Sequence, residues 1–207
     1  MGSVAKDDAI AFQNIKKRLV DDVGRILSVI DGQFSPFWAV ARMLFPIAEA
    51  IGDLIYRDDH STVKNLEQVF QYEFEEVRAG YKNKANLITQ LYRHSLTHID
   101  ELRELKDGDL ICTWYLALDR SANHLFSEKL GEKIRINFDL LQFYDDIGCL
   151  LDRLIKKATE NVYGGKVGER YKSWTKLNIS QGRRYEVARI ELSNLLGITK
   201  IKNDNTQ

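Results

Sequence analysis

The sequence predicts a mainly α-helical bundle with a small β-hairpin inserted between the fourth and fifth long helices. Three observations support this fold class. The 207 residues include only two prolines, turn-forming residues rarely cluster, and apolar residues recur every three or four positions over long segments. A hydrophobic fraction of 44% and a charged fraction of 29% are ordinary for a globular protein. We expect one domain, with a bundle over residues 1–160 and a helical C-terminal extension over residues 161–207.

Hydrophobic spacing and a capping signal predict the first two helices. The first covers about residues 7–30, where apolar side chains share one helix face. Ser35, as the N-cap, and Pro36, at the first helical position, begin a second helix. This helix is expected to kink at Pro46, which lacks an amide donor. Charged residues interrupt its apolar run "FWAVARMLFPIAEAIGDLI", which indicates a core helix and not a membrane span.

The remaining elements follow from changes in the hydrophobic period. Two further helices are predicted over about residues 61–80 and 84–105, and the latter should pack against helices two and three. The runs "LICTWYLALD" and "EKIRINFDL" are rich in β-branched and aromatic residues, and they predict the two strands of a hairpin within residues 109–139. Helical spacing returns over residues 140–155, and we expect a last helical segment over residues 169–196.

Charge and cysteine usage argue against several classes of function. Lys plus Arg and Asp plus Glu number 30 each, so no net charge attracts the protein to nucleic acid, although a local basic patch is not excluded. Cys112 and Cys149 lack the spacing of metal or redox motifs, and we expect both to be reduced core residues. The opening "MGSVAKDDAI" has no signal-peptide pattern, so we expect a cytoplasmic protein that does not bind membranes.

The stretch "QLYRHSLTHIDELREL", residues 90–105, is the main candidate for chemistry. It has the apolar spacing of a buried helix face, yet it carries Arg93, His94 and His98 within six positions. His94 and His98 are four residues apart, a spacing that lets two imidazoles bind one metal ion. A zinc site needs a third ligand, and "HSLTH" lacks the internal Glu of a helical metalloprotease motif. Metal binding is therefore the lesser alternative, and we predict no metal site.

The pair Arg93 and His98 also suits cleavage of an RNA phosphodiester. Arginine is a permanent cation suited to phosphate, and histidine transfers protons near neutral pH. His98 would activate the ribose 2′-hydroxyl or protonate the leaving oxygen, while Arg93 stabilises the charged phosphorane. One such helix supplies a single acid–base group, so a second copy from a homodimer partner would complete the pair.

The motif "YRHSLTH" resembles the signature of the HEPN superfamily (higher eukaryotes and prokaryotes nucleotide-binding). That signature is an Arg, often followed by a polar residue, and then a His after a short gap. Arg93, the polar His94 and His98, with four residues between Arg93 and His98, match it. The resemblance is carried mainly by residues 35–105. The hairpin after the motif departs from the clearest members, and no nucleotidyltransferase partner sequence lies in this chain.

The resemblance implies a helical up-and-down bundle that works as a homodimer. Many members are metal-independent endoribonucleases, often toxins or antiphage effectors, for which an antitoxin protein is a further expected partner. Other members bind RNA or nucleotide without cleavage. On this basis we expect RNA or nucleotide as the ligand, no cofactor, and Arg93, His94 and His98 as the catalytic residues.

The alternative function is that of a non-catalytic helical interaction protein. In that case Arg93 forms a surface ion pair, and the motif histidines line or cap the core. Three other patterns carry less chemistry. The aspartates of "FYDDIGCLLD" are expected on a solvated helix face, and "YGGKVGER" is expected to be a loop because it lacks the spacing of a phosphate-binding loop. Arg120 and His124 lie in a predicted turn and are not taken as a second catalytic motif.

Overall fold

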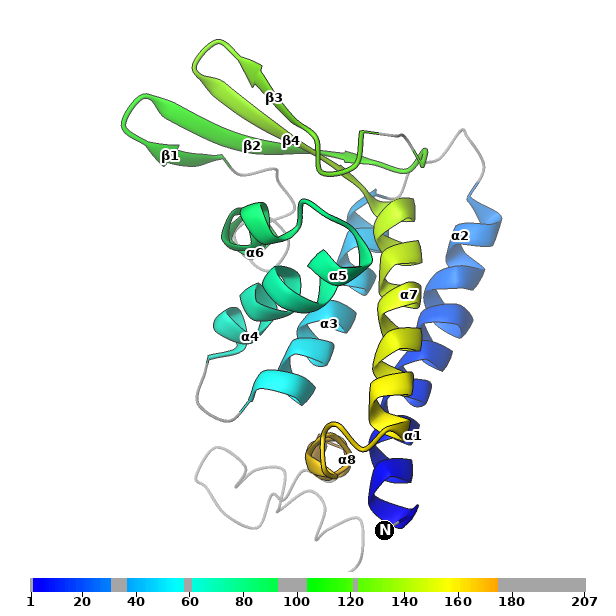
Figure 1. The fold of residues 1–207 in the computed structure, drawn as a ribbon. Coiled ribbons are helices and arrows are strands. Elements are labelled where there is room, and N and C mark those ends of the chain that lie inside the picture. The colour runs from blue at the N-terminus through cyan, green and yellow to red at the C-terminus, as the bar shows by residue number, and fades with distance from the viewer. Residues whose placement is uncertain (1, 31–36, 58–60, 93–103, 121–122, 175–207) are drawn as a thin grey trace, which may run out of the picture. The chain divides into compact units, whose positions relative to one another are not determined.

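The computed structural model describes residues 2–30, 37–57, 61–92, 104–120 and 123–174. The chain separates into two compact units, residues 1–171 and 172–207. Residues 172–174 are the described part of the second unit, so the fold described here is that of the first (Figure 1).

The described residues are mostly helical, as the sequence predicts, and they also contain one small mixed sheet. The first three predicted helices are present, and each of the first and third contains a π-helical turn. In chain order, the helical elements are α1 (Gly2–Arg18), η1 (Leu19–Gly24), α2 (Arg25–Val29), α3 (Phe37–Tyr56), α4 (Thr62–Gln68), η2 (Val69–Phe74), α5 (Glu75–Val77), η3 (Lys82–Lys84), α6 (Ala85–Tyr92), α7 (Leu140–Thr159) and α8 (Lys166–Trp174).

Local side-chain caps explain where two of these helices begin. The Ser61 side chain accepts a hydrogen bond from the Lys64 amide at 3.4 Å and caps α4. The Asp139 carboxylate accepts from the amide of Leu141 at 2.9 Å and caps α7. Because Asp139 is also the last residue of β4, the same residue ends this strand and caps α7.

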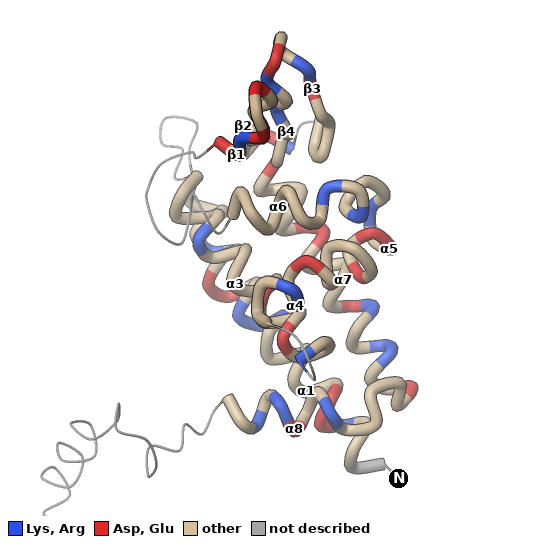
Figure 2. Tube along the Cα trace, turned by 90° about the vertical axis from the view of Figure 1, so that its left-hand side faces the viewer, with Lys and Arg blue, Asp and Glu red and all other residues tan. Residues whose placement is uncertain are grey.

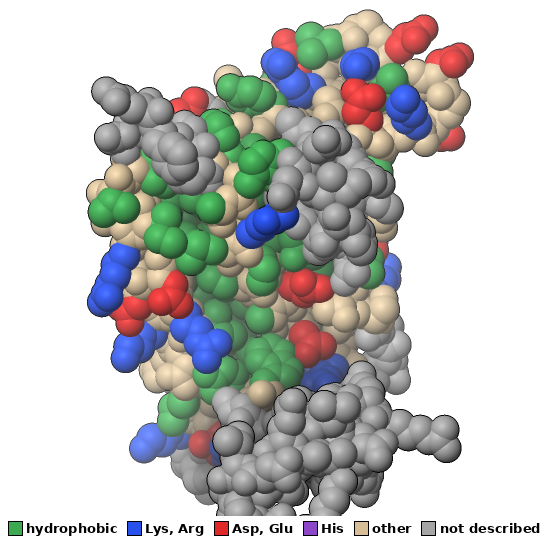
Figure 3. Space-filling view, turned by 180° about the vertical axis from the view of Figure 1, so that it is seen from behind, with side chains coloured by type: hydrophobic (Ala, Val, Ile, Leu, Met, Phe, Trp, Pro, Cys, Tyr) green, Lys and Arg blue, Asp and Glu red, His purple; other side chains and the backbone are tan. Residues whose placement is uncertain are grey.

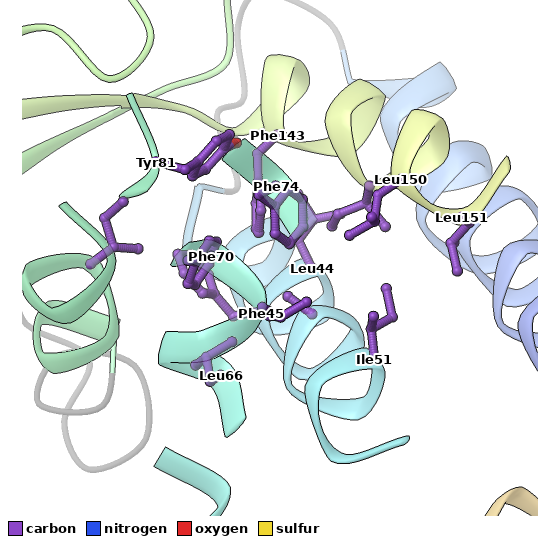
Figure 4. Close-up of a cluster of buried hydrophobic side chains, with 14 of the residues drawn as sticks. Leu44, Phe45, Ile51, Leu66, Phe70, Phe74, Tyr81, Phe143, Leu150 and Leu151 are labelled. Carbon is purple, nitrogen blue, oxygen red and sulfur yellow. The ribbon is translucent and has the colours of Figure 1, made fainter. Parts of the chain in front are cut away.

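The core is built around the ring of Phe45 on α3. Phe45 is fully buried, and its ring centroid lies between 4.5 and 6.3 Å from five other aromatic rings, which belong to Phe70, Tyr92, Trp114, Phe138 and Phe143. These rings come from η2, α6, β2, β4 and α7, so one side chain contacts helices and sheet alike. Figure 4 shows Phe45 beside Phe70 and Phe74 in this cluster.

The described part of the predicted fourth helix, α6, packs against α3 and α4, which confirms the expected neighbours. Tyr92 stacks on Phe45 with a centroid distance of 4.5 Å, and α6 also contacts α4. A close approach of α3 and α4 requires a glycine at position 52. A Cβ there would lie 2.6 Å from the carbonyl oxygen of Asn65.

The sheet has four strands in the order β1-β2-β4-β3: β1 (Leu105–Asp107), β2 (Leu110–Ala117), β3 (Ser127–Leu130) and β4 (Lys133–Asp139). The two predicted strand runs are β2 and β4, but the prediction that they form one hairpin is wrong. They pair in parallel, with Trp114 opposite Ile136. The segment between them contains β3, which is antiparallel to β4, so the chain reverses twice and β4 returns in the direction of β2. Each belongs to a separate hairpin, whose turns contain Gly108 and Gly131 with positive φ.

The two faces of the sheet differ because side chains alternate along each strand. The face that packs on the helices carries four buried side chains, which belong to Trp114, Leu116, Ile136 and Phe138. On β2, Tyr115 therefore points to the opposite face, which we call the outer face. In Figure 1 the sheet lies over one end of the helices, with the tips of both hairpins extending beyond them.

The glycine-rich "YGGKVGER" is not all loop, because α8 begins within it at Lys166. Asp8 of α1 is fully buried and accepts hydrogen bonds from the amides of Gly165 at 2.8 Å and Gly168 at 2.7 Å. These amides are at the start of α8, where backbone N–H groups have no carbonyl acceptor within the helix. A Cβ at Gly168 would lie 2.9 Å from the backbone carbonyl carbon of Asp7, so the glycine allows the close approach.

The surface properties match the sequence predictions in part. Figure 2 shows both signs of charge on the helices and on the sheet, with no segregation among the described elements. No described helix is both long and apolar enough to cross a membrane. The prediction of two core cysteines is wrong for Cys149, which is exposed on α7, while Cys112 is half-buried and burial raises its thiol pKa. Cys149 directly precedes the buried Leu150. Successive residues of an α-helix are rotated by about 100° about its axis, so the two side chains lie on different faces of α7.

Candidate functional site

The predicted catalytic residues Arg93, His94 and His98 lie outside the described residues. The residue before them, Tyr92, is the last described residue of α6 and is 3% exposed. Its ring stacks on Phe45, and its hydroxyl donates to the Glu49 carboxylate at 3.4 Å. The chain therefore enters the predicted motif from a residue that is fixed in the core, and the positions of the three motif side chains stay predictions.

A buried polar cluster of the described residues centres on Asp146. We call it the Asp146 cluster; it comprises Arg78, Tyr81, His124, Gln142 and Asp146. The Asp146 side chain is 4% exposed. Its carboxylate accepts from Arg78 Nε at 2.8 Å and Nη2 at 3.0 Å, from the Tyr81 hydroxyl at 3.0 Å, and from Gln142 Nε2 at 3.4 Å. This bidentate contact between an arginine and a carboxylate is the geometry that gives the strongest ion pairs.

His124 completes the cluster as a neutral ring. Its Nδ1 accepts from the Asp139 amide at 3.0 Å, so the single proton of the neutral ring is on Nε2 and is donated to the Tyr81 hydroxyl at 2.9 Å. Tyr81 in turn donates to Asp146. The pKa of His124 is lowered to about 4: burial is the main cause, the negative charge of Asp146 opposes it, and the nearby Arg78 cation adds to it.

This lowered pKa predicts a stability that rises with pH between about 4 and 6.5. In that interval unfolded His124, with its ordinary pKa near 6.5, binds a proton that the folded ring excludes. The contribution is therefore complete above pH 6.5, declines as the pH falls, and is gone below about pH 4. We expect the melting temperature of the wild type to approach that of His124→Asn, which cannot titrate, as the pH is lowered through this interval. A difference between the two melting temperatures that stays constant with pH would contradict the assignment.

The tertiary fold brings the cluster together from segments distant in sequence. Asp146 follows Phe143 by three residues and precedes Leu150 by four, so it shares the buried face of α7. The expectation that the aspartates of this helix are solvated is therefore wrong for Asp146. The helical period of the neighbouring apolar residues is the sequence signal that could have found it.

His124 and Arg120 also have different roles from those that their shared turn suggests. Both lie in the connection between β2 and β3, yet the His124 side chain is only 2% exposed. Arg120 has a φ of 54° and forms a surface ion pair with Asp145 at 2.9 Å. Arg120 and His124 therefore have separate surroundings and do not form one catalytic motif, as the sequence predicts. No sequence signal shows that His124 would be buried.

The Asp146 cluster has a structural role, because its hydrogen bonds join α7 to the segments that carry Tyr81 and His124. Burial, followed by the negative charge of Asp146, raises the Tyr81 pKa well above its ordinary value, and the His124 pKa is far below neutral. Both groups are therefore neutral near pH 7, and neither has the pKa close to the working pH that suits a general acid or base best. A surface depression of about 420 Å³ reaches the cluster at Arg78 and Asp146 and is also lined by Cys149.

No three His, Cys, Asp or Glu side chains within the described ranges are grouped so as to hold a metal ion. Comparisons of the chain with protein-family models, with curated proteins and with solved structures found no match.

Proposed function

We propose that the protein binds RNA and cleaves it without a metal ion, as an endoribonuclease of the HEPN type. The observation that supports this most is the sequence "YRHSLTH", whose tyrosine, Tyr92, is held in the core by Phe45 and Glu49. Catalysis requires reacting groups to be held in place, and a motif that starts from a buried, stacked aromatic residue meets the first part of that requirement. In this proposal the described helices belong to an up-and-down bundle.

The three motif residues have separate roles in the proposed reaction. His98 accepts the proton of the ribose 2′-hydroxyl or donates one to the leaving 5′-oxygen. Arg93 places two guanidinium N–H groups on the phosphate oxygens, where negative charge grows in the transition state. His94 is the polar residue beside the arginine and forms hydrogen bonds to the same phosphate. The products are a 2′,3′-cyclic phosphate and a free 5′-hydroxyl.

We further propose a homodimer, because one motif supplies a single acid–base group. In the view from behind, hydrophobic side chains gather in a broad band between charged ones (Figure 3). Leu27 of α2 and Met43 and Ile47 of α3 are apolar residues that the described core leaves half-buried. Contiguous exposed apolar surface is typical of protein–protein contacts.

The biological setting proposed is a cytoplasmic toxin or defence effector controlled by an antitoxin protein.

The test is cleavage of a mixed-sequence RNA pool by the purified protein in excess EDTA. We expect cleavage to persist, because Arg93 and not a metal ion neutralises the phosphate, and we expect cyclic-phosphate ends. Light scattering on the same sample should give twice the chain mass of 23.9 kDa. Activity that EDTA removes and zinc restores would favour the histidine metal site instead. A protein that leaves every RNA intact is not a ribonuclease.

A further inference from the structure

The short helix α6 is attached to the fold by a buried tyrosine at each end. Tyr81 directly precedes η3, which runs into α6, and its side chain is fully buried. Its hydroxyl donates to the Asp146 carboxylate of α7 at 3.0 Å. Tyr92, the last described residue of α6, donates to the Glu49 carboxylate of α3 at 3.4 Å. We call these tyrosines the first and the second anchor. The chain enters the predicted motif directly from the second anchor.

The first anchor fixes the backbone that leads into α6. The amides on either side of Tyr81, those of Gly80 and Lys82, donate to the Glu75 carboxylate at 3.0 and 2.7 Å. The Tyr81 carbonyl accepts from the Lys84 amide at 3.0 Å, and this bond forms the 3₁₀ turn η3. Its ring packs in the buried aromatic cluster that Figure 4 shows. Packing and hydrogen bonds together therefore set the place where α6 begins.

The second anchor attaches the other end of α6 to a different helix. The Tyr92 ring stacks on that of Phe45, with 4.5 Å between the centroids and 8° between the planes. Stacking limits the tilt of the ring, and the hydroxyl bond to Glu49 limits its rotation within the plane. This bond is longer than that of Tyr81, so the first anchor has the stronger hydrogen bond. Two attachment points, on α7 and α3, fix the direction of the helix axis, which one point cannot do.

We propose that Tyr81 and Tyr92 are positioning residues for the cleavage reaction, an inference that rests on the proposed function. Each acts by holding α6, and through it the start of the motif at Arg93. Apolar packing is non-directional, whereas a hydroxyl–carboxylate bond has a preferred distance and angle. The rate of a catalysed reaction depends on placing the reacting groups to about 1 Å or better. Directional anchors at both ends of α6 therefore raise the cleavage rate without adding a contact to RNA.

The test removes one hydroxyl at a time and keeps each ring, in full-length protein. Tyr81→Phe and Tyr92→Phe are compared with wild type and with two controls. Tyr72→Phe makes the same chemical change at a tyrosine that is 50% exposed on η2. Asp8→Ala removes the buried acceptor of two amides at the start of α8, so it lowers the stability through α1 and α8 and not through α6.

Two measurements separate positioning from stability. The first is single-turnover cleavage of the RNA pool over a range of RNA concentrations, well below the melting temperature of every variant. The second is hydrogen exchange of the amides of residues 85–92 relative to those of residues 166–171. Exchange reports the local opening of a helix whether or not the protein cleaves RNA.

We expect Tyr81→Phe to speed exchange in α6 about tenfold relative to α8, because both hydrogen bonds of its hydroxyl are lost. The maximal cleavage rate should fall about tenfold. The RNA concentration that gives half this rate should stay within about twofold of wild type, since the phosphate contacts remain. Tyr92→Phe should show the same pattern with a smaller effect, because its hydroxyl bond is longer.

The controls should behave differently. Tyr72→Phe should match wild type in both measurements. Asp8→Ala should melt at a lower temperature and speed exchange in α8 relative to α6, yet the folded protein should cleave RNA at the wild-type rate.

The outcomes separate the inference from the proposed function. Unchanged exchange in α6 of Tyr81→Phe would show that the hydroxyl does not hold the helix. Faster exchange together with a wild-type cleavage rate would show that α6 does not position the motif, while the proposed function stands. An Asp8→Ala protein that cleaves as slowly as Tyr81→Phe would assign the loss to stability in general and overturn the inference. If the wild type cleaves no RNA, the proposed function and the inference both fall.

Discussion

Replacing His98 by alanine should lower the rate of RNA cleavage by about a hundredfold or more, the usual cost of removing a general acid–base group. The substitution removes the only group of the motif that transfers a proton in the proposed reaction. RNA binding should persist, because the phosphate contacts of Arg93 are unchanged. The measurement is single-turnover cleavage of an RNA pool, with the melting temperature of each variant recorded beside it.

Two further variants test the roles of the neighbouring residues. Arg93→Lys should also cleave RNA much more slowly than wild type. An ammonium group on a flexible chain cannot reproduce the planar bidentate contact of a guanidinium with phosphate. His94→Asn should be the mildest of the three, since asparagine keeps a polar hydrogen-bonding group beside the arginine. All three should melt close to the wild-type temperature if the side chains border a groove.

The alternative function, a non-catalytic interaction protein, gives the opposite pattern. In that case wild type cleaves no RNA, and His98→Ala melts at a lower temperature because it leaves a cavity or an unpaired group in the core. An inert wild type together with an unstable His98→Ala protein would falsify the ribonuclease proposal.

Replacing Asp146 by alanine should lower the free energy of unfolding by about 3 kcal/mol. The variant removes the acceptor of the Tyr81 hydroxyl, which is fully buried, and the counter-charge of Arg78. We place the expected loss at the lower end of the range for broken buried pairs, because the Arg78 side chain is 37% exposed and is then hydrated. Chemical denaturation with urea measures this difference directly.

The matched control is the neighbouring aspartate on the same helix. Asp145 pairs with Arg120 at the surface, so Asp145→Ala should change the stability by less than about 1 kcal/mol. Asp146→Asn should fall between the two, because it keeps an acceptor for Tyr81 but loses the charge opposite Arg78. Equal effects of Asp145→Ala and Asp146→Ala would show that the Asp146 cluster does not hold these elements together.

The sequence predicted the helices well because their signals are local. The apolar period of α3 and α7 is visible within each segment, and the cap at Ser61 involves an amide three residues away. The fourth predicted helix is described to Tyr92 only, so the candidate catalytic site within it is still a prediction from sequence.

The pairing of the strands could not be predicted in the same way. The β-branched and aromatic composition of β2 and β4 located both strands, but composition does not specify a partner. Their parallel arrangement depends on β3, a short strand whose four residues, three of them polar or charged, give little signal of their own.

The sequence by itself determined the mainly helical class, the positions of most described helices and of strands β2 and β4, and the Arg–His motif, because each depends on residues close together in the chain. Only the tertiary structure decided that Asp146, Tyr81 and His124 meet, and that the Tyr92 ring stacks on that of Phe45. Tyr81 and Asp146 are 65 positions apart, and each is ordinary in its own segment. The physical reason is that burial and hydrogen bonding between distant side chains arise from the packing of whole elements, which no local pattern records.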